Sequence, residues 1–315
     1  MSTLILTLSL TACVGSPTWR TTSGAVWGTT YHITYESEKD LSDSVVAVTG
    51  EINSSLSMFS PLSTVSRINS GETDTVDSHF EKVFNVARKI FDASDGAFDP
   101  TVAPLVDLWG FGREGRDIDL PDSATVSEVM EKVGLDRAFI ADGRVIKGHP
   151  QMEFDFSAIA KGYGVEQVAE MLRRNGCSNF MVEIGGEIQI EGHNPNKKAW
   201  RIQIDAPMPD SEPGDSALMI VDLTDCAIAT SGNYRNFRAV SVDSIVGHTL
   251  NPKTGYPAPK YLLSVTVIAP GCTEADALAT ALMASSPDRV NGILSRFPEV
   301  KAILVLPSGE IIEKP

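Results

Sequence analysis

Residues 155–164, DFSAIAKGYG, place a carboxylate, a hydroxyl, an ammonium group and two glycines at the start of a helical pattern. A helix needs only one capping side chain at its N-terminus, so this segment carries more polar groups than the backbone requires. Glycine also lets a ligand approach the backbone closely. The segment therefore predicts a site for a polar ligand, with Asp155 and Lys161 as its charged members.

A second helical pattern, TEADALATALM at 273–283, pairs a carboxylate with a hydroxyl. Asp276 and Thr280 are four positions apart, so they lie on one face of a helix. Their oxygens are hard donors that suit Mg²⁺, which keeps its other positions for waters and phosphate oxygens. On spacing alone the structural interpretation is the more common one, because Thr273 and Asp276 also fit a capping box that needs no ligand.

Two turn-rich segments, TSGNYRNF at 230–237 and HTLNPKTGYP at 248–257, gather further polar side chains. His248 directly precedes Asn-Pro and Thr-Gly pairs, which are typical of turns. A lone histidine is more often structural, so only these neighbours favour a catalytic or ligand-binding role for His248.

Aromatic residues alternate with glycine and proline in GAFDPTVAPLVDLWGFG, residues 96–112. Phe98 is either a core residue or a ligand contact, because a flat ring can stack on a planar ligand. Asp99 precedes a proline and is either a turn-forming residue or a ligand contact.

A glycine pair interrupts the apolar strand VEIGGEI, residues 182–188. Gly185 and Gly186 weaken a strand, so they indicate a bulge or the close approach of another backbone or a ligand. The flanking carboxylates, Glu183 and Glu187, are either surface groups or members of a site.

The elements that must position these residues form clusters along the chain. A strand is expected at 25–35, helices at 42–59, 78–94, 127–133 and 164–175, and a strand pair within 137–154. Strands then follow one another from 179 to 270, before helices at 274–285 and 289–297 and a last strand at 301–307. Because the strands come in hairpin-like groups rather than a strict βαβ series, we expect an α+β fold with mainly antiparallel sheets and packed helices.

Length and charge narrow the classes of function. The 315 residues suffice for one large domain or two lobes. The formal net charge of −15 argues against binding nucleic acid or anionic lipid through a broad basic surface. A small anionic ligand remains possible, because one locally positive pocket can hold it.

The N-terminus resembles that of a bacterial lipoprotein. The apolar run at 4–10 is too short to span a bilayer and resembles the core of a signal peptide. It ends in Leu10-Thr11-Ala12-Cys13, which resembles a lipobox, although the leader lacks Lys and Arg and a chance cysteine is the alternative. This interpretation gives a signal peptide at 1–12, a tether at 13–23 that starts with a lipidated Cys13, and a single domain at 24–315.

Eight stretches, in this order, resemble the ApbE family of FAD:protein FMN transferases. They are GTTYHITY, SMFSPLSTVSRIN, GAFDPTV, DFSAIAKGYGV, VEIGGEI, TSGNYRNF, HTLNPKTGYP and EADALATALM. They span nearly the whole chain after the leader. The resemblance implies a T-fold-like α+β architecture. It also implies an enzyme that cleaves FAD with the help of Mg²⁺, attaches FMN to a Thr or Ser hydroxyl of an acceptor protein, and releases AMP.

The resemblance also implies the site residues. The Mg²⁺ ligands would be the side chains of Asp276 and Thr280 and the backbone carbonyl of Ala158. The matching flavin contacts are Trp27, Phe59, Ala97, Phe98, Asp99, Asp155, Lys161 and Leu250. Asp155 would bind flavin or ribityl groups, Lys161 would face the phosphates or the adenosine part, and His248 is our candidate for the general base.

Three positions depart from the pattern of many relatives. Ala279 stands where some relatives have an additional Asp ligand, Trp27 where many have Met, and Phe59 where many have Tyr. Water can replace the missing carboxylate, and the flavin contacts of the two aromatic residues are expected to differ in detail.

Partners and location follow from the same resemblance. Acceptors in the family are subunits of membrane redox complexes, such as sodium-pumping quinone reductases, and the lipobox predicts a lipid anchor on the periplasmic side of a bacterial membrane. Two alternatives stay open: a Mg²⁺-dependent FAD pyrophosphatase that yields FMN and AMP, and a non-catalytic flavin-binding lipoprotein. The combination of Asp276, Thr280 and His248 counts against the second, since storage needs neither metal nor base.

Overall fold

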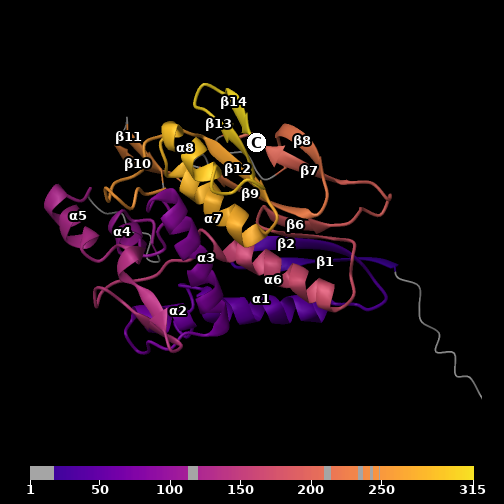
Figure 1. Cartoon of the computed structure of the whole chain (residues 1–315), viewed down its shortest axis with the longest axis horizontal. Coiled ribbons are helices and arrows are strands. Elements are labelled where there is room, and N and C mark those ends of the chain that lie inside the picture. The colour runs from indigo at the N-terminus through magenta and orange to yellow at the C-terminus, as the bar shows by residue number, and fades with distance from the viewer. Residues whose placement is uncertain (1–17, 113–119, 209–213, 233–236, 242–243, 248) are drawn as a thin grey trace, which may run out of the picture.

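The computed structural model describes residues 18–112, 120–208, 214–232, 237–241, 244–247 and 249–315. Its centre is an eight-stranded sheet (Figure 1). In spatial order the strands are β1 (Thr18–Val26), β2 (Thr29–Ser37), β5 (Phe180–Ile184), β6 (Glu187–Glu191), β9 (Cys226–Gly232), β12 (Ser264–Ala269), β13 (Lys301–Val305) and β14 (Ile311–Lys314). Every neighbouring pair is antiparallel, which confirms the expected α+β fold with mainly antiparallel sheets.

Three two-stranded sheets and the helices complete the described fold. The pairs are β3 (Phe139–Ala141) with β4 (Arg144–Ile146), β7 (Trp200–Asp205) with β8 (Ala217–Leu223), and β10 (Phe237–Ser241) with β11 (Ser244–Gly247). The helices are α1 (Ser42–Leu56), α2 (Thr64–Asn69), α3 (Ser78–Ser94), α4 (Ala103–Leu108), α5 (Ser123–Met130), α6 (Ala160–Arg174), α7 (Cys272–Met283) and α8 (Pro287–Leu294). Within the described residues, no helix combines the length and apolarity that crossing a bilayer requires.

The two faces of the large sheet are covered differently (Figure 1). Helices α1, α3, α6 and α7 pack together along one face, and the β7–β8 hairpin lies over the other. Side chains alternate accordingly, as successive strand residues must. In β5, Phe180 and Val182 join the core under the helices, whereas Met181 packs against the hairpin cluster around Trp200 and Ile202.

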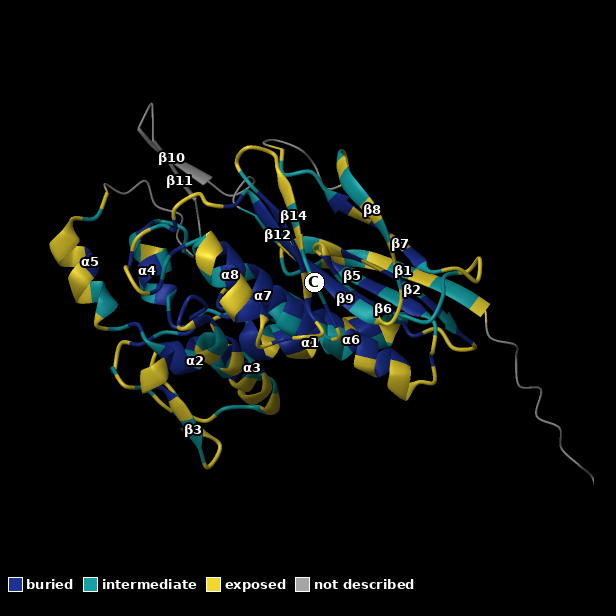
Figure 2. Ribbon diagram, turned by 45° about the horizontal axis from the view of Figure 1, so that its top comes forward, coloured by how far each residue is buried: buried dark blue, intermediate teal, exposed yellow. Residues whose placement is uncertain are grey.

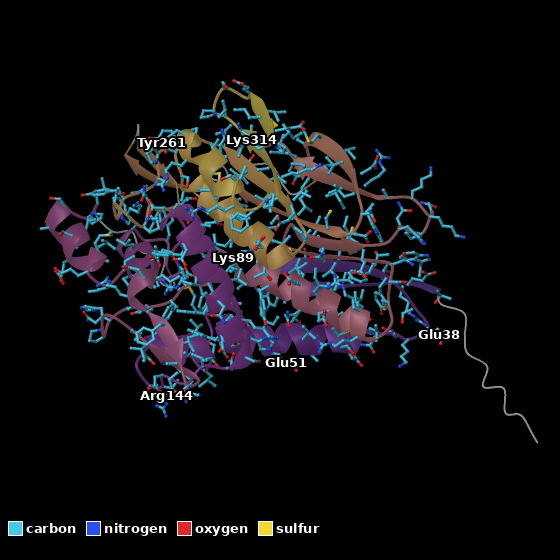
Figure 3. The ribbon with its side chains drawn as sticks, in the orientation of Figure 1. Glu38, Glu51, Lys89, Arg144, Tyr261 and Lys314 are labelled. Atoms are coloured by element: carbon cyan, nitrogen blue, oxygen red, sulfur yellow. The ribbon has the colours of Figure 1, made fainter. Side chains whose placement is uncertain are left out.

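Helix α7 is the most deeply buried of the helices that form the site (Figure 2). It packs on β9 and β12 and lies beside α3 and α6. Alanines at 275, 277, 279 and 281 keep it narrow, so neighbouring elements approach closely. Lys89 of α3, labelled in Figure 3, forms an ion pair with Glu274 at the start of α7. Because α7 is packed on all these sides, Asp276, in its second turn, is only 4% exposed.

Some boundaries differ from those expected. Helix α3 has the expected bounds, because its cap is local: the Asp77 carboxylate accepts from the backbone of His79 and Phe80. Helix α6 begins at Ala160, earlier than expected at 164, although Ile159 provides no side-chain cap. The reason is a cap from elsewhere in the fold, since Gly162 donates its backbone N–H to Asp276.

Candidate active site

A cavity of about 760 Å³ lies beside the starts of α6 and α7. Its walls also come from the loop after α1, from segment 97–112, from the end of β9 and from the turn at 249–252. The volume falls within the range of roughly 300–1,000 Å³ that is typical of small-molecule sites. Segments far apart in the sequence thus form one concave site.

Most of the predicted site residues line this cavity. They are Phe59, Ala97, Phe98, Asp99, Asp155, Ala158, Lys161, Leu250, Asp276 and Thr280. The proposed metal ligands and most of the proposed flavin contacts are therefore brought together by the fold, as the resemblance implied.

The N-termini of α6 and α7 cap one another. The Asp276 side chain of α7 accepts from the backbone N–H of Gly162 at 2.9 Å. The Glu166 side chain of α6 accepts from the backbone N–H and the hydroxyl of Thr273 in α7, at 3.0 and 2.6 Å. Thr273 and Asp276 therefore do not form the capping box that their spacing allowed, because α7 takes Gly271 as its N-cap without a side-chain bond.

Close packing at this junction requires Gly162. A methyl group at this position would lie 2.3 Å from the carbonyl oxygen of Cys272 and 2.6 Å from Cβ of Asp276. The glycine is therefore present because the two helices touch there. It also keeps Asp276 beside the first turn of α6.

Two buried carboxylates that line the cavity, Glu187 and Asp276, act on the ammonium group of Lys161. Lys161 forms an ion pair with Glu187, which is only 2% exposed. Burial alone would lower the pKa of Lys161, but the charges of Glu187 and Asp276 outweigh it and raise that pKa above its ordinary value. Burial also raises the pKa of both carboxyl groups, an effect that the Lys161 charge opposes. Within the described part of the chain, these two carboxylates thus share the charge of Lys161.

The oxygen donors near Asp276 suit a hard cation. Thr280 lies one turn further along α7 and shares a 3.1 Å hydrogen bond with Ser231 of β9. Ala158 lines the same cavity. No group of three His, Cys, Asp or Glu side chains that could hold a metal occurs among the described residues. One carboxylate, one hydroxyl and one carbonyl do not match a zinc site, but they suit Mg²⁺, which retains waters and binds substrate phosphates.

Asp99 shapes its own loop. One carboxylate oxygen accepts from the backbone and the hydroxyl of Thr101, at 2.7 and 2.6 Å, and the other accepts from the backbone of Leu135 at 3.1 Å. Burial raises the pKa of Asp99 despite these bonds. The turn-forming interpretation is thus confirmed, and a direct flavin contact by this side chain stays a prediction.

Asp155 joins two walls of the cavity. Its backbone N–H donates to the carbonyl of Pro100 at 2.7 Å, and its carboxylate accepts from the backbone of Ser157 at 2.8 Å. Phe59 lines the same cavity and is 71% exposed, so its ring is available to a ligand.

Trp27 occupies a different place. Its indole N–H donates to the carbonyl of Thr49 in α1 at 3.3 Å. Its ring packs so closely on α6 that a methyl group at Gly164 would lie 2.1 Å from it. The structure therefore puts Trp27 between helices, and its predicted flavin contact stays a prediction.

His248 and Cys13 lie outside the described residues. Thr249 and Leu250, which follow His248 in the chain, both line the cavity. The roles of His248 as a base and of Cys13 as a lipid attachment site remain predictions.

The structure separates the two glutamates that the sequence left open. Glu183 pairs with His32 at 2.9 Å near the surface, whereas Glu187 is buried in the cavity. The signal for this was the two-residue turn at Gly185 and Gly186, which pairs Glu187 with Ile184. Directly paired residues share one face of a sheet, so Glu187 lies on the core face.

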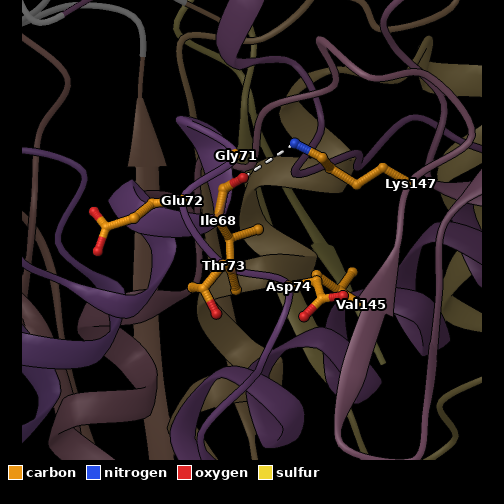
Figure 4. Close-up of a pocket in the computed structure, with 7 residues that line it drawn as sticks. All are labelled: Ile68, Gly71, Glu72, Thr73, Asp74, Val145 and Lys147. Atoms are coloured by element: carbon orange, nitrogen blue, oxygen red, sulfur yellow. Dashed lines mark hydrogen bonds between the residues drawn. The ribbon is translucent and has the colours of Figure 1, made fainter.

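A second, smaller cavity of about 340 Å³ lies between α2 and the β3–β4 hairpin (Figure 4). The ammonium of Lys147 donates to the carbonyl of Ile68 there, at 3.0 Å, in the last turn of α2. None of the predicted site residues lines it. It is accounted for as a helix-end contact, and the larger cavity is the candidate active site.

Comparisons with known proteins place this chain beside one family. The profile of the ApbE family matches residues 27–304. A FAD:protein FMN transferase from Haemophilus influenzae is 34% identical over 299 residues, covering 90% of this chain and 86% of that protein. A protein of the same name from Vibrio cholerae is 37% identical over 277 residues, covering 85% and 81%.

Solved structures agree as well. The flavin transferase ApbE from Vibrio cholerae matches with a TM-score of 0.84 at 33% identity, over 95% of this chain and 97% of that one. The apo form of the Pseudomonas stutzeri flavinyl transferase ApbE gives a TM-score of 0.81 at 30% identity, over 96% and 97%. The family profile, the sequence relatives and the shared fold lead to one conclusion: this chain belongs to the ApbE family.

Proposed function

We propose that this chain is a Mg²⁺-dependent FAD:protein FMN transferase. The observation that carries the proposal is one cavity in which Asp276 and Thr280 lie together with Lys161 and apolar walls. The names of the relatives, which are FAD:protein FMN transferases, support the same activity.

The proposed reaction is a single transfer of a phosphoryl-linked group. A Thr or Ser hydroxyl oxygen of the acceptor protein attacks the phosphorus of the FMN half of FAD. The P–O bond to the AMP half breaks, AMP leaves with the bonding electron pair, and a phosphoester links FMN to the acceptor. The hydroxyl is a weak nucleophile, so a base helps by taking its proton. His248 is our candidate, since the unperturbed pKa of histidine is about 6.5.

In this proposal, the residues that line the cavity hold the substrate and the cation. Lys161 places positive charge beside the phosphates, and Asp155 offers a carboxylate to flavin or ribityl groups. Asp276, Thr280 and the Ala158 carbonyl would hold the cation. Mg²⁺ bound there would neutralise phosphate charge and help to orient the leaving AMP.

Two alternatives use the same cavity. In a FAD pyrophosphatase, water replaces the acceptor hydroxyl, and FMN and AMP are both released. In a flavin-binding lipoprotein, FAD is held without reaction. The buried Asp276 beside Thr280 favours an enzyme, because a protein that only stores FAD does not need side chains that bind a metal ion.

The acceptor and the location are part of the proposal. We take the acceptor to be a subunit of a membrane redox complex, such as a sodium-pumping quinone reductase. We also propose that a lipid on Cys13 anchors the enzyme on the periplasmic side of a bacterial membrane.

The test combines the protein with FAD, Mg²⁺ and the flavin-carrying domain of such a subunit. Mass spectrometry of the acceptor should show FMN on a Thr or Ser, with AMP in solution, and an acceptor that lacks this hydroxyl should stay unmodified. Free FMN and AMP with an unmodified acceptor would identify a pyrophosphatase instead. Intact FAD in the presence of Mg²⁺ would contradict both enzymatic proposals.

A further inference from the structure

Glu187 is a buried carboxylate with one side-chain partner, Lys161, among the described residues. It is the first residue of β6, directly after the turn at Gly185 and Gly186, and it lines the cavity at 2% exposure. One oxygen, Oε1, accepts from Lys161. The other oxygen, Oε2, is buried and has no hydrogen-bond partner within the described part of the chain.

Stability alone does not explain this arrangement. A buried acceptor without a donor costs free energy, and buried ion pairs are often no better for stability than apolar residues of the same volume. The next residue on the same face of β6, Gln189, repeats the pattern. Its amide nitrogen donates to the Pro270 carbonyl at 3.2 Å, which leaves its buried Oε1 unpartnered among the described residues. Polar groups retained at such a cost point to a role in the site.

Two carboxylates act electrostatically on Lys161, and one of them forms an ion pair with it. The charges of Glu187 and Asp276 both act on its ammonium group, but the ion pair is formed with Glu187. Asp276 instead accepts from the backbone of Gly162 through Oδ2. Its other oxygen, Oδ1, has no hydrogen-bond partner among the described residues, and Asp276 lines the cavity.

We propose that Glu187 is a positioning residue that holds the Lys161 ammonium away from Asp276 and so keeps Asp276 available to a divalent cation. The inference rests on the proposed Mg²⁺ site. Without the charge of Glu187, the carboxylate that attracts Lys161 is Asp276, and an ammonium group there competes with Mg²⁺ for the same oxygens. Glu187 thus acts on the cation through Lys161.

Binding measurements in a double-mutant cycle test this without relying on turnover. Isothermal titration gives the Mg²⁺ affinity of the wild type, Glu187→Gln, Lys161→Met and the double variant, and melting curves check that each is folded. Changes in residues that position metal ligands typically cost about 10–100-fold in metal affinity. We expect a loss of this size for Glu187→Gln alone. We expect little or no loss when the same change is made in the Lys161→Met background.

Glu183→Gln is the matched control, because it removes a carboxylate from the same hairpin on the other face of the sheet. It should leave the Mg²⁺ affinity unchanged. An equal loss for Glu187→Gln in both backgrounds would overturn the inference, since Glu187 would then act on the cation directly. No loss of Mg²⁺ affinity in either background would also overturn the inference about Glu187, but it would leave the proposed Mg²⁺ site intact. A wild type that does not bind Mg²⁺ would remove the metal site and this inference together.

Discussion

Asp276 of α7 accepts a hydrogen bond from the backbone N–H of Gly162, in the first turn of α6, at 2.9 Å. Glu166 of α6 returns this contact at the start of α7, through Thr273. Two helix N-termini, each with a partial positive charge, are thereby fixed side by side at the cavity. Anions such as phosphates are stabilised at helix N-termini. One carboxylate therefore serves both the architecture and, in our proposal, the metal.

The first prediction separates these two roles of Asp276. Asp276→Asn keeps an oxygen that can accept from Gly162 but removes the negative charge that a Mg²⁺ ligand supplies. We expect the fold to persist with a small loss of melting temperature, while FMN transfer at ordinary Mg²⁺ is abolished and partly recovers at high Mg²⁺. The measurement is the transfer rate against Mg²⁺ concentration, beside melting curves.

Thr280→Val completes that experiment. Water replaces a neutral hydroxyl more easily than a carboxylate, so this variant should need more Mg²⁺ but be less impaired than Asp276→Asn. Superimposable Mg²⁺ curves for the wild type and both variants would show that this pair does not hold the metal.

The second prediction concerns Gly162. In Gly162→Ala the added methyl group would collide with the backbone of Cys272, so α6 and α7 must move apart. Overpacking of this kind costs about 1–3 kcal/mol of unfolding free energy. Gly50→Ala is the control: Gly50 lies in α1 with nothing within 4 Å of an added Cβ, so alanine should be stabilising there by about 0.5–1 kcal/mol. Denaturant titrations of both variants test this, and equal stabilisation would contradict the close packing.

The sequence revealed local features of the fold and not the long-range ones. The bounds of helix α3 can be predicted because its cap, Asp77, directly precedes its apolar pattern in the chain. The start of α6 cannot, because its cap comes from Asp276, more than a hundred residues away. The pair Gly185-Gly186 indicates a turn or a bulge, but the sequence alone does not fix the sheet register that places Glu187 opposite Ile184.

The candidate site shows the same difference between local features and long-range contacts. Most of the residues that the motifs single out line one cavity, since each motif keeps its own neighbours. The motifs do not give the packing of Trp27 between helices or the pairing of Lys161 with Glu187. Both depend on contacts between elements that only the folded chain creates.

The third prediction concerns acid pH. Asp95, at the end of α3, accepts from Lys253 at 2.7 Å and from Arg289 at 2.8 Å, and these bonds lower its pKa from 3.8 to about 2. Because the folded pKa lies below the unfolded one, the contribution to stability is complete above about pH 4 and is lost as the pH falls through about 2. The melting temperature of Asp95→Asn should therefore lie slightly below that of the wild type near neutral pH, since an exposed ion pair contributes little, and converge with it in acid.

The same contact anchors the turn that carries Leu250, so Asp95→Asn should also bind FAD more weakly at neutral pH. Asp92→Asn, an exposed change on the same helix, is the control and should follow the wild type throughout. A difference between wild type and Asp95→Asn that stays constant down to pH 2 would contradict this assignment.

The fourth prediction concerns the N-terminus. If Leu10-Thr11-Ala12-Cys13 is a lipobox, the protein should fractionate with membranes and Cys13→Ala should release it. Cys226→Ala removes a cysteine within the folded domain and should leave the protein with the membranes. Equal distribution of the wild type and Cys13→Ala would contradict the lipid anchor and leave the enzymatic proposal intact.

The last prediction concerns His248 and the acceptor hydroxyl. If His248 takes the proton of that hydroxyl, His248→Ala should slow FMN transfer by about 10²–10⁴-fold, the usual loss on removing a general base. FAD affinity should change little, because the described wall of the cavity remains. Leu250→Ala is the contrasting variant: it removes an apolar side chain two residues further along that lines the cavity, so it should weaken FAD binding. Single-turnover transfer rates and FAD titrations distinguish the two effects. Normal transfer by His248→Ala would assign His248 a structural role and leave the base to be sought among the other polar residues that line the cavity.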